Sequence, residues 1–406
     1  MPQQLLPAIV LLAAVGALTA QAQSYTVLYS FQGGTDGKNP EAGLIRDPAG
    51  NLYGTTYKGG AANLGVIFKL DPTGHQTVLH SFTSAPDGAW PCAPLVRDPA
   101  GRLYGTAAYG GLAACGVPEP GIPAGCGVVF RIDAAGNETV LHRFAGTDGA
   151  NPNGGLALSA GGLAGVTSNA GGAATTTCNL DFTGCGVAFT IDPSGRESTL
   201  YNFTGGVDGG PPSSSLVRDA AGNLYGVTAN GGASGQGAVF KIDPAGIETV
   251  LYSFTGGADG GVPQGSLLRD TAGILYGTAY TGGLSTCAPL GCGLVFKLDT
   301  AGRETVLYNF TGGPDGSNPH TGVISDPSGN LYGTTYLGGA AGPPSGYGTI
   351  FKIDTSGRET TLYRFNGAQG AYPSALIRDR AGNLYGTTTL GGGNASGVVF
   401  KFSPQH

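Results

Sequence analysis

Apolar residues occur in this chain as short runs separated by turns rich in Gly, Asp and Pro, and the whole pattern returns seven times. The most regular marker is the run Leu-Tyr-Gly-Thr or a close variant of it. Its copies begin at Leu52, Leu103, Leu163, Leu224, Leu275, Leu331 and Leu384. An internal period of about 50 residues is typical of repeat architectures such as propellers.

Each unit contains four apolar runs of strand length, which we name A to D in chain order. In the first unit they cover residues 43–46, 51–56, 65–70 and 77–82. Short runs bounded by turn residues predict β-strands. Asp47-Pro48-Ala49-Gly50 lies between A and B, and Asp71-Pro72-Thr73-Gly74 lies between C and D. Asp, Pro and Gly at these places favour tight reversals, so each unit is predicted to form an antiparallel sheet.

The two ends of the chain hold complementary parts of a unit. Residues 26–31 match a D run with no A, B or C before them, whereas residues 375–401 supply A, B and C runs with no D after them. A closed ring uses this arrangement, because a strand from one end completes the last sheet and removes two open edges. We therefore predict an all-β fold, a seven-bladed β-propeller with four antiparallel strands per blade. Residues 24–31 are predicted to close the ring as the outermost strand of the last blade.

The N-terminal segment has the features of an export signal. An apolar run at residues 5–18 is followed by Ala20-Gln21-Ala22, a small-residue cleavage site. We predict a signal peptide over residues 1–22 and one propeller over residues 23–406, secreted to the extracellular space or the periplasm without membrane insertion. A net charge of −6 with no cluster of Lys or Arg argues against nucleic acid as a partner, and we expect a monomer.

The run Leu-Tyr-Gly-Thr-Thr, followed by Gly-Gly and by Gly-x-(Val/Ile)-Phe-Lys, occurs over residues 52–69 and 384–401. It resembles the GloVer tandem repeat of exported bacterial proteins described as "choice-of-anchor", and the resemblance covers essentially the whole mature chain. The order of strands is also similar to NHL-type propellers, which bind proteins or RNA. The resemblance implies a secreted or cell-surface propeller and carries no known activity with it.

Almost all variation in unit length falls in the connection between B and C. From the B glycine to the C phenylalanine the interval ranges from 14 to 25 residues, whereas the C and D phenylalanines are 14 residues apart wherever both follow in order. Successive connections alternate between the two faces of a propeller, so the B–C and D–A loops share one face. Because binding residues concentrate in variable loops on a rigid scaffold, we expect function on this face. Neutral insertion is the alternative.

The seven cysteines support both export and this loop assignment. We predict three disulfides, each within one B–C loop: Cys115–Cys126, Cys178–Cys185 and Cys287–Cys292. The spacing does not match a zinc site, and an oxidising compartment favours disulfides. Cys92 is left over in a D–A loop, and we expect it to be a buried, inert thiol.

A search for catalytic groups finds no established motif. Of the 26 carboxylates, all but Glu41, Glu119 and Asp181 fall at positions that recur between units. His320 is the one histidine in a D–A loop, and no zinc-binding, nucleophile or phosphate-binding motif occurs. We therefore predict no catalytic residue, no metal and no cofactor, and we favour a protein that is not an enzyme.

Aromatic and polar residues in or beside the variable loops form the first group of candidate binding residues. Exposed aromatic rings among Asn and Gly suit sugar rings or protein contacts. The group comprises Trp90, Tyr372, His320, Asn318, Tyr57, Tyr280 and Tyr336. We expect Trp90 to lie outside the blade cores, where its ring can stack on a ligand. Packing under a loop is the alternative for any one of these residues.

Arginine in strand A forms the second group. It occurs in five units, at Arg46, Arg97, Arg218, Arg269 and Arg378, with Ser159 and Ser325 in the other two. Facing the central channel, these arginines would form a partial cationic ring for an anionic group. In the alternative, which we favour, each one pairs with a blade Asp or a turn carbonyl.

Together these observations favour a non-catalytic exported module that binds a glycan or a cell-surface or envelope protein. A polysaccharide lyase or hydrolase on the same scaffold is the first alternative, because a lyase needs little beyond one base and a cation. A structural component of the envelope or matrix is the second.

Overall fold

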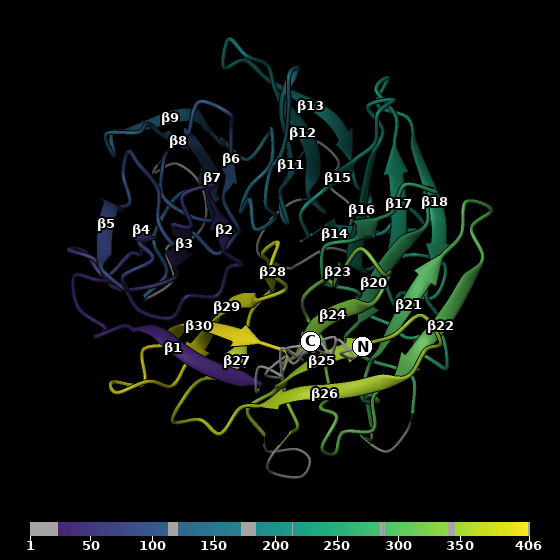
Figure 1. The fold of residues 1–406 in the computed structure, drawn as a ribbon. Helices are drawn as coiled ribbons and strands as arrows, with labels where there is room; N and C mark the ends of the chain where they lie inside the picture. Colours follow the sequence, from purple (N-terminus) through teal and green to yellow (C-terminus); the bar gives the residue numbers. More distant parts are fainter. Residues whose placement is uncertain are drawn as a thin grey trace, which may run out of the picture.

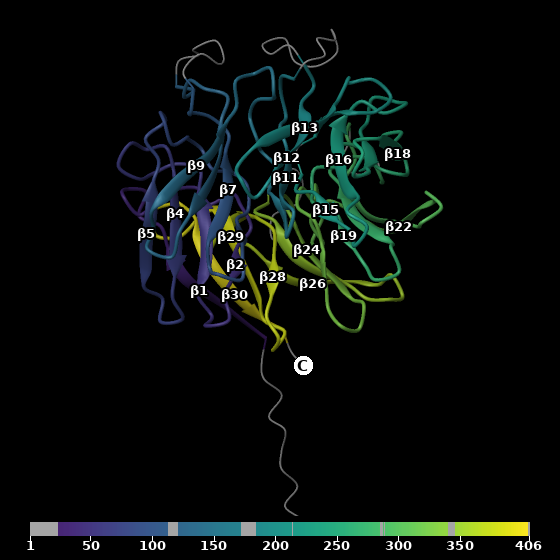
Figure 2. The same cartoon turned by 90° about the horizontal axis from the view of Figure 1, so that it is seen from above.

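The computed structural model describes residues 23–112, 121–171, 184–212, 214–284, 287, 289–339 and 346–404. The predicted signal peptide, residues 1–22, lies outside this part of the chain. The described residues form seven antiparallel sheets arranged in a ring, a seven-bladed β-propeller (Figure 1). Figure 2 shows the same ring turned by 90°, with the blades seen side-on. In these ranges no helix is long and apolar enough to cross a membrane.

Each blade takes its strands in chain order from the central axis outward, except that the outermost strand of the seventh blade comes from the N-terminal part of the chain. The first blade comprises β2 (Ile45–Arg46), β3 (Leu52–Thr56), β4 (Val66–Leu70) and β5 (Gln76–Ser81), and the second β6 (Val96–Arg97), β7 (Leu103–Ala107), β8 (Val128–Ile132) and β9 (Glu138–Arg143). The third comprises β10 (Ala157–Ser159), β11 (Gly162–Val166), β12 (Val187–Ile191) and β13 (Glu197–Asn202). The fourth comprises β14 (Gly210–Pro212), β15 (Val217–Arg218), β16 (Leu224–Asn230), β17 (Ala238–Ile242) and β18 (Glu248–Ser253).

The remaining three blades follow the same plan. The fifth comprises β19 (Leu268–Arg269), β20 (Leu275–Ala279), β21 (Leu294–Leu298) and β22 (Glu304–Asn309), and the sixth β23 (Ile324–Ser325), β24 (Leu331–Thr335), β25 (Thr349–Ile353) and β26 (Glu359–Arg364). The seventh comprises β27 (Ala371–Pro373), β28 (Ile377–Arg378), β29 (Leu384–Leu390), β30 (Val398–Ser403) and β1 (Ser24–Ser30). In the fourth and seventh blades the inner position is shared by two short strands, which both pair with the same neighbour.

The glycine of the Leu-Tyr-Gly-Thr run makes room for the core phenylalanine of the next strand. In the first blade Gly54 lies opposite Phe68 in the ladder. A Cβ on Gly54 would lie only 2.7 Å from Cζ of Phe68 and 2.9 Å from Cδ2 of Leu44, so no larger residue fits. Phe68 is fully buried, and burying such a ring contributes about 1.5–3 kcal/mol. The Gly in strand B and the Phe in strand C are therefore one packing unit.

Packing between blades comes mainly from the phenylalanines of strand D. Phe82 packs edge-to-face on Phe130 of the next blade, with ring centroids 5.4 Å apart. Phe31 packs in the same way on Phe68, at 5.2 Å, although the two residues come from the last and first blades. One such phenylalanine pair lies between each two neighbouring blades around the ring.

The N-terminal strand closes the ring as predicted. β1 pairs antiparallel with β30, from Ser24 opposite Ser403 to Ser30 opposite Val398, and Figure 1 shows the purple β1 alongside the yellow β30. Tyr25 stacks on Tyr363 of the sixth blade, with ring centroids 4.1 Å apart. The first described strand therefore contributes both to the sheet of its own blade and to the contact with a neighbour.

Hydrogen bonds from strand B hold the start of the next blade close to the axis. The Thr55 hydroxyl donates to the Ala93 carbonyl at 3.5 Å, and the Thr106 hydroxyl donates to the Gly154 carbonyl at 3.3 Å. The corresponding threonines of three further blades make the same bond: Thr278 to Thr321, Thr334 to Ser374 and Thr387 to Ala42. Since these carbonyls belong to the D–A loops, the bonds fix those loops around the central axis.

Candidate binding site

A cavity of 770 Å³ lies on the propeller axis where the D–A loops and the ends of strand B converge. All seven blades contribute to its wall. Two recurring positions supply the larger side chains of the wall, one in the D–A loop and one at the end of strand B, and smaller residues of the D–A loops such as Gly43, Ser266 and Ala375 complete it. Their side chains determine what the cavity can hold.

The D–A loop position follows a proline that the loops share. The residue after this proline is polar or carries a thiol in each of the first six blades, and its identity changes from blade to blade. It is Glu41, Cys92, Asn153, Ser213, Gln264 and His320. Ser213 lies outside the described residues, and the other five all line the cavity. The seventh blade is one residue shorter here.

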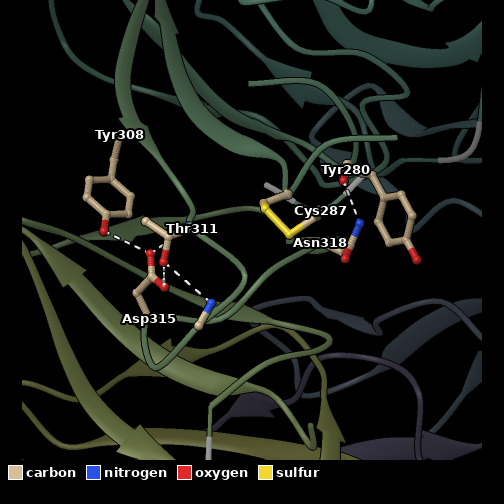
Figure 3. Close-up of a disulfide and its surroundings, with 8 residues drawn as sticks. Tyr280, Cys287, Tyr308, Thr311, Asp315 and Asn318 are labelled. Carbon is tan, nitrogen blue, oxygen red and sulfur yellow. Dashed lines mark hydrogen bonds between the residues drawn. A yellow bond between two sulfur atoms is a disulfide. The ribbon is translucent and has the colours of Figure 1, made fainter. Parts of the chain in front are cut away.

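The residue before the proline turns the chain toward the axis. In six blades this residue has a left-handed backbone, with φ between 52° and 59°: Asn39, Trp90, Asn151, Val262, Asn318 and Tyr372. Asparagine tolerates this conformation well. Its side chain also bonds to the preceding blade: Nδ2 of Asn318 donates to the Tyr280 carbonyl at 3.0 Å (Figure 3). Asn318 is thus placed beside the cavity by a structural bond between blades.

Trp90 occupies the same loop position but is a packing residue. Only 9% of it is exposed, and its ring lies between Tyr57 and Tyr109, with centroids 4.7 Å and 5.1 Å away. The expectation of an exposed ring outside the packed interior is therefore wrong. The physical reason is that the left-handed turn directs this side chain between the first two blades.

The strand B position carries tyrosine in three blades: Tyr57, Tyr280 and Tyr336. Tyr280 and Tyr336 line the cavity, whereas Tyr57 lies behind the wall against Trp90. Tyr372 stacks on Tyr336, with centroids 4.6 Å apart. The structure therefore brings Tyr280, Tyr336 and Tyr372 to one side of the axis and separates Tyr57 from them.

His320 lies on the cavity wall against Tyr336, with ring centroids 4.8 Å apart and planes at 76°. Its Nδ1 atom is buried and has no hydrogen-bond partner among the described residues. Burial lowers the pKa of His320 to about 4, so the imidazole is neutral at neutral pH. His320 therefore contributes a neutral aromatic ring to the cavity wall.

Glu41 is the residue of this site that the sequence search did not select. Its side chain faces the cavity and makes no hydrogen bond or ion pair with any described residue. Burial raises the pKa of its carboxyl, and the positive charge of Lys58 opposes this effect. Two features of the sequence could have identified Glu41 as a candidate. It is one of three carboxylates outside the recurring positions, and it occupies the loop position that varies between units.

The sequence model of the Gloeobacter/Verrucomicrobia repeat matches residues 14–179, 175–290 and 285–406. The chain belongs to this repeat family. No curated protein matches it. Solved structures with similar folds include a gluconolactonase from Xanthomonas campestris, 12% identical, with a TM-score of 0.47 over 95% of this chain and 90% of the other. A putative 6-phosphogluconolactonase from Bacteroides uniformis is 15% identical, with a TM-score of 0.49 over 80% and 84% of the two chains. We draw no functional conclusion from structures this distant.

The cysteines of this repeat protein agree with the predicted pairing wherever they are described. Cys287 and Cys292 form a disulfide (Figure 3). Cys126 and Cys185 are also disulfide-bonded; their predicted partners, Cys115 and Cys178, lie outside the described residues. Cys92 is a free cysteine on the cavity wall, and its thiol donates to Oδ1 of Asn153 at 3.4 Å. Burial raises its pKa to about 12, which favours the thiol over the more reactive thiolate at neutral pH.

The strand A arginines of the repeat lie apart from the cavity, because none of the five is among its described lining residues. Several contact the preceding blade. The guanidinium of Arg46 lies over the ring of Tyr385 at 5.8 Å, and that of Arg269 lies over Tyr225 at 5.4 Å. Nη1 of Arg218 donates to the Ser159 hydroxyl at 2.7 Å. Through these contacts the arginines connect neighbouring blades.

The sheet register corrects the place given to Ser159. Leu158 lies opposite Leu163, as Arg46 lies opposite Leu52 in the first blade. Leu158 therefore holds the arginine position in the third blade. Ser159 is one residue further along, where it accepts the hydrogen bond from Arg218.

One group among the described residues has the spacing of metal ligands. His142, Asp148 and Glu197 place their ligand atoms within 4.8 Å of one another. They lie away from the cavity wall, and Nε2 of His142 is already hydrogen-bonded to Asp148 at 2.8 Å. In the third blade Tyr201 makes the corresponding bond to Asp208 at 3.0 Å. The histidine therefore replaces a tyrosine in a structural hydrogen bond.

Proposed function

We propose that this repeat protein is an exported, non-catalytic binding module and that a glycan is its ligand, held in the axial cavity. The observation that carries the proposal is the loop position after the shared proline. Turns, core residues and contacts between blades are nearly uniform from unit to unit, but this position differs in every one of the first six blades. In the five blades where this position is described, it contributes a different side chain to the cavity wall. Such a wall is suited to a ligand that has no internal symmetry.

The size of the cavity favours a small ligand over a protein surface. A volume of 770 Å³ lies within the range of about 300–1,000 Å³ that is usual for small-molecule sites. A protein partner would normally bind a broad patch rather than a cavity of this size. An oligosaccharide end fits the space.

The chemistry of the wall suits a sugar. Asn153 and Gln264 offer amide groups, and Tyr280 and Tyr336 offer aromatic rings. Amides and hydroxyls can bond to sugar hydroxyls, while an aromatic ring can pack against the apolar face of a sugar. His320 adds a neutral imidazole ring to the wall.

A glycan array probed with the mature chain tests the proposal, followed by titration calorimetry of the strongest ligand. Gln264→Ala removes an amide from the cavity wall and should weaken binding by roughly tenfold, as expected for about 1.4 kcal/mol. Gln76→Ala is the matched control, because this glutamine bonds to the Asp36 carbonyl at 3.1 Å, away from the cavity. It should bind like the parent.

Several results would contradict the proposal. They are an array with no bound glycan, equal affinity of Gln264→Ala and the parent, or cleavage of the bound glycan into products. The last of these would favour the lyase or hydrolase alternative.

A further inference from the structure

We infer that the glycan carries an amino group and that Glu41 recognises it. This inference rests on the proposed function and adds the chemical class of the ligand. Its starting point is the charge of the cavity. Among the described lining residues Glu41 is the one that carries a formal charge at neutral pH, because no Lys, Arg or Asp lines the wall and His320 is neutral.

Glu41 has no partner within the protein. It makes no hydrogen bond or ion pair with a described residue, and its side chain is exposed on the cavity wall, where a ligand can reach it. A ligand ammonium group would form a charge-assisted hydrogen bond with this carboxylate, which is about twice as strong as a neutral one.

The aromatic residues around Glu41 favour the same kind of ligand. Tyr280 and Tyr336 line the same cavity as Glu41. Such rings attract cations placed over their faces.

Lys58 shows that an ammonium group is accommodated beside this cluster. Its Nζ lies 5.6 Å from the ring centroid of Tyr57 and 5.9 Å from that of Trp90. It also lies near enough to Glu41 to act on the pKa of that carboxyl, yet the two do not form an ion pair. Lys58 is thus a weak internal competitor for a ligand amine.

The same charges disfavour acidic sugars. A uronic acid in the cavity would meet the Glu41 carboxylate and no lining Lys or Arg. Repulsion between like charges in a partly desolvated site opposes binding. The expected order of affinity is therefore amine-bearing, then neutral, then acidic.

Glucosamine oligosaccharides and N-acetylglucosamine oligosaccharides of equal length form a matched pair of probes, since they differ only in the charge and acetylation of the nitrogen on each sugar. Calorimetry at about pH 6.5, below the ~7.7 that is typical of an α-amino group, should show the amine form binding roughly tenfold more tightly to the parent. Glu41→Gln should abolish this preference and keep the affinity for the acetylated form. Gln264 shows that glutamine is accepted at this loop position.

Two further variants complete the test. Glu359→Gln removes a carboxylate from the outer rim, at a strand position where the first blade already has Gln76, and should retain the preference for the amine. Lys58→Met removes the competitor and should strengthen binding of the amine form by a few-fold.

Equal or tighter binding of the acetylated form overturns the inference and leaves the proposed function standing. A preference for the amine that persists in Glu41→Gln overturns the role of Glu41. If neither probe binds while other neutral glycans do, the inference also fails. If no glycan binds at all, the inference and the proposed function fail together.

Discussion

Glu248 should make the stability of the propeller depend on pH. It opens β18 and faces Asp208 in the loop that leaves the preceding blade. Asp208 accepts hydrogen bonds from the Tyr201 hydroxyl at 3.0 Å and from the Thr204 backbone N–H at 2.8 Å. Oε1 of Glu248 is buried and has no partner among the described residues. Burial, and after it the charge of Asp208, raises the pKa of Glu248 to about 7.

The sign of the effect follows from the direction of this change. The pKa in the native state lies above the unfolded value of 4.5, so the native state favours the protonated carboxyl. The stability that this contributes is fully present below pH 4.5 and is lost as the pH rises through about 7. The two pKa values differ by about 2.5, which at 1.36 kcal/mol per pH unit gives an upper limit of about 3.4 kcal/mol. Because the side chain is only half-buried, solvent screening reduces this to about 1–2 kcal/mol.

Glu248→Gln replaces the titrating carboxyl with a neutral group of the same shape. Its free energy of unfolding should be close to that of the parent at about pH 4.5, and about 1–2 kcal/mol higher than that of the parent at about pH 8. Urea unfolding followed by circular dichroism and by the fluorescence of Trp90, the single tryptophan, measures the difference. Gln76→Glu is the reciprocal control, because Gln76 holds the same strand position in the first blade.

Compared with the parent, Gln76→Glu should have a lower free energy of unfolding at about pH 8 and nearly the same free energy of unfolding at about pH 4.5. A difference between Glu248→Gln and the parent that stays constant over this pH range would refute the reasoning, as would a difference that is larger in acid.

Three other predictions concern the fold. Deleting β1 (Ser24–Ser30) should expose the edge of β30 and give aggregates in size-exclusion chromatography; a monomer that melts like the parent would disprove ring closure as a requirement. Trp90→Ala should destabilise the protein by about 3 kcal/mol in chemical unfolding, because it removes a buried ring; an unchanged midpoint would indicate that the neighbouring tyrosines refill the space. Non-reducing peptide mapping should pair Cys126 and Cys185 each with a cysteine of its own B–C loop and find Cys92 unpaired, and a bridge between different loops would contradict the assignment.

The sequence was sufficient to predict the propeller because each repeated residue has one packing function. Gly54 and Phe68 recur together since the phenylalanine ring fills the space that the glycine leaves. The division of one blade between the two chain ends has no use except ring closure, and β1 pairs with β30 accordingly.

The cavity wall was only partly predictable. His320, Tyr280 and Tyr336 were selected as unusual residues near variable loops, and all three line the cavity. Glu41 was noticed as an unexplained carboxylate but not placed, because its position depends on the left-handed turn before the shared proline. The alternation of apolar and polar residues does not reveal such a turn. The same turn buries Trp90, which was expected to be exposed because it lies in a D–A loop.

A crystal structure of the protein with its strongest array ligand tests the central claim most directly. We predict that the sugar lies in the axial cavity, in contact with Tyr336 and within hydrogen-bond distance of Gln264 and His320. A ligand bound at the A–B turns or on the outer rim, with the axial cavity empty, would contradict the account.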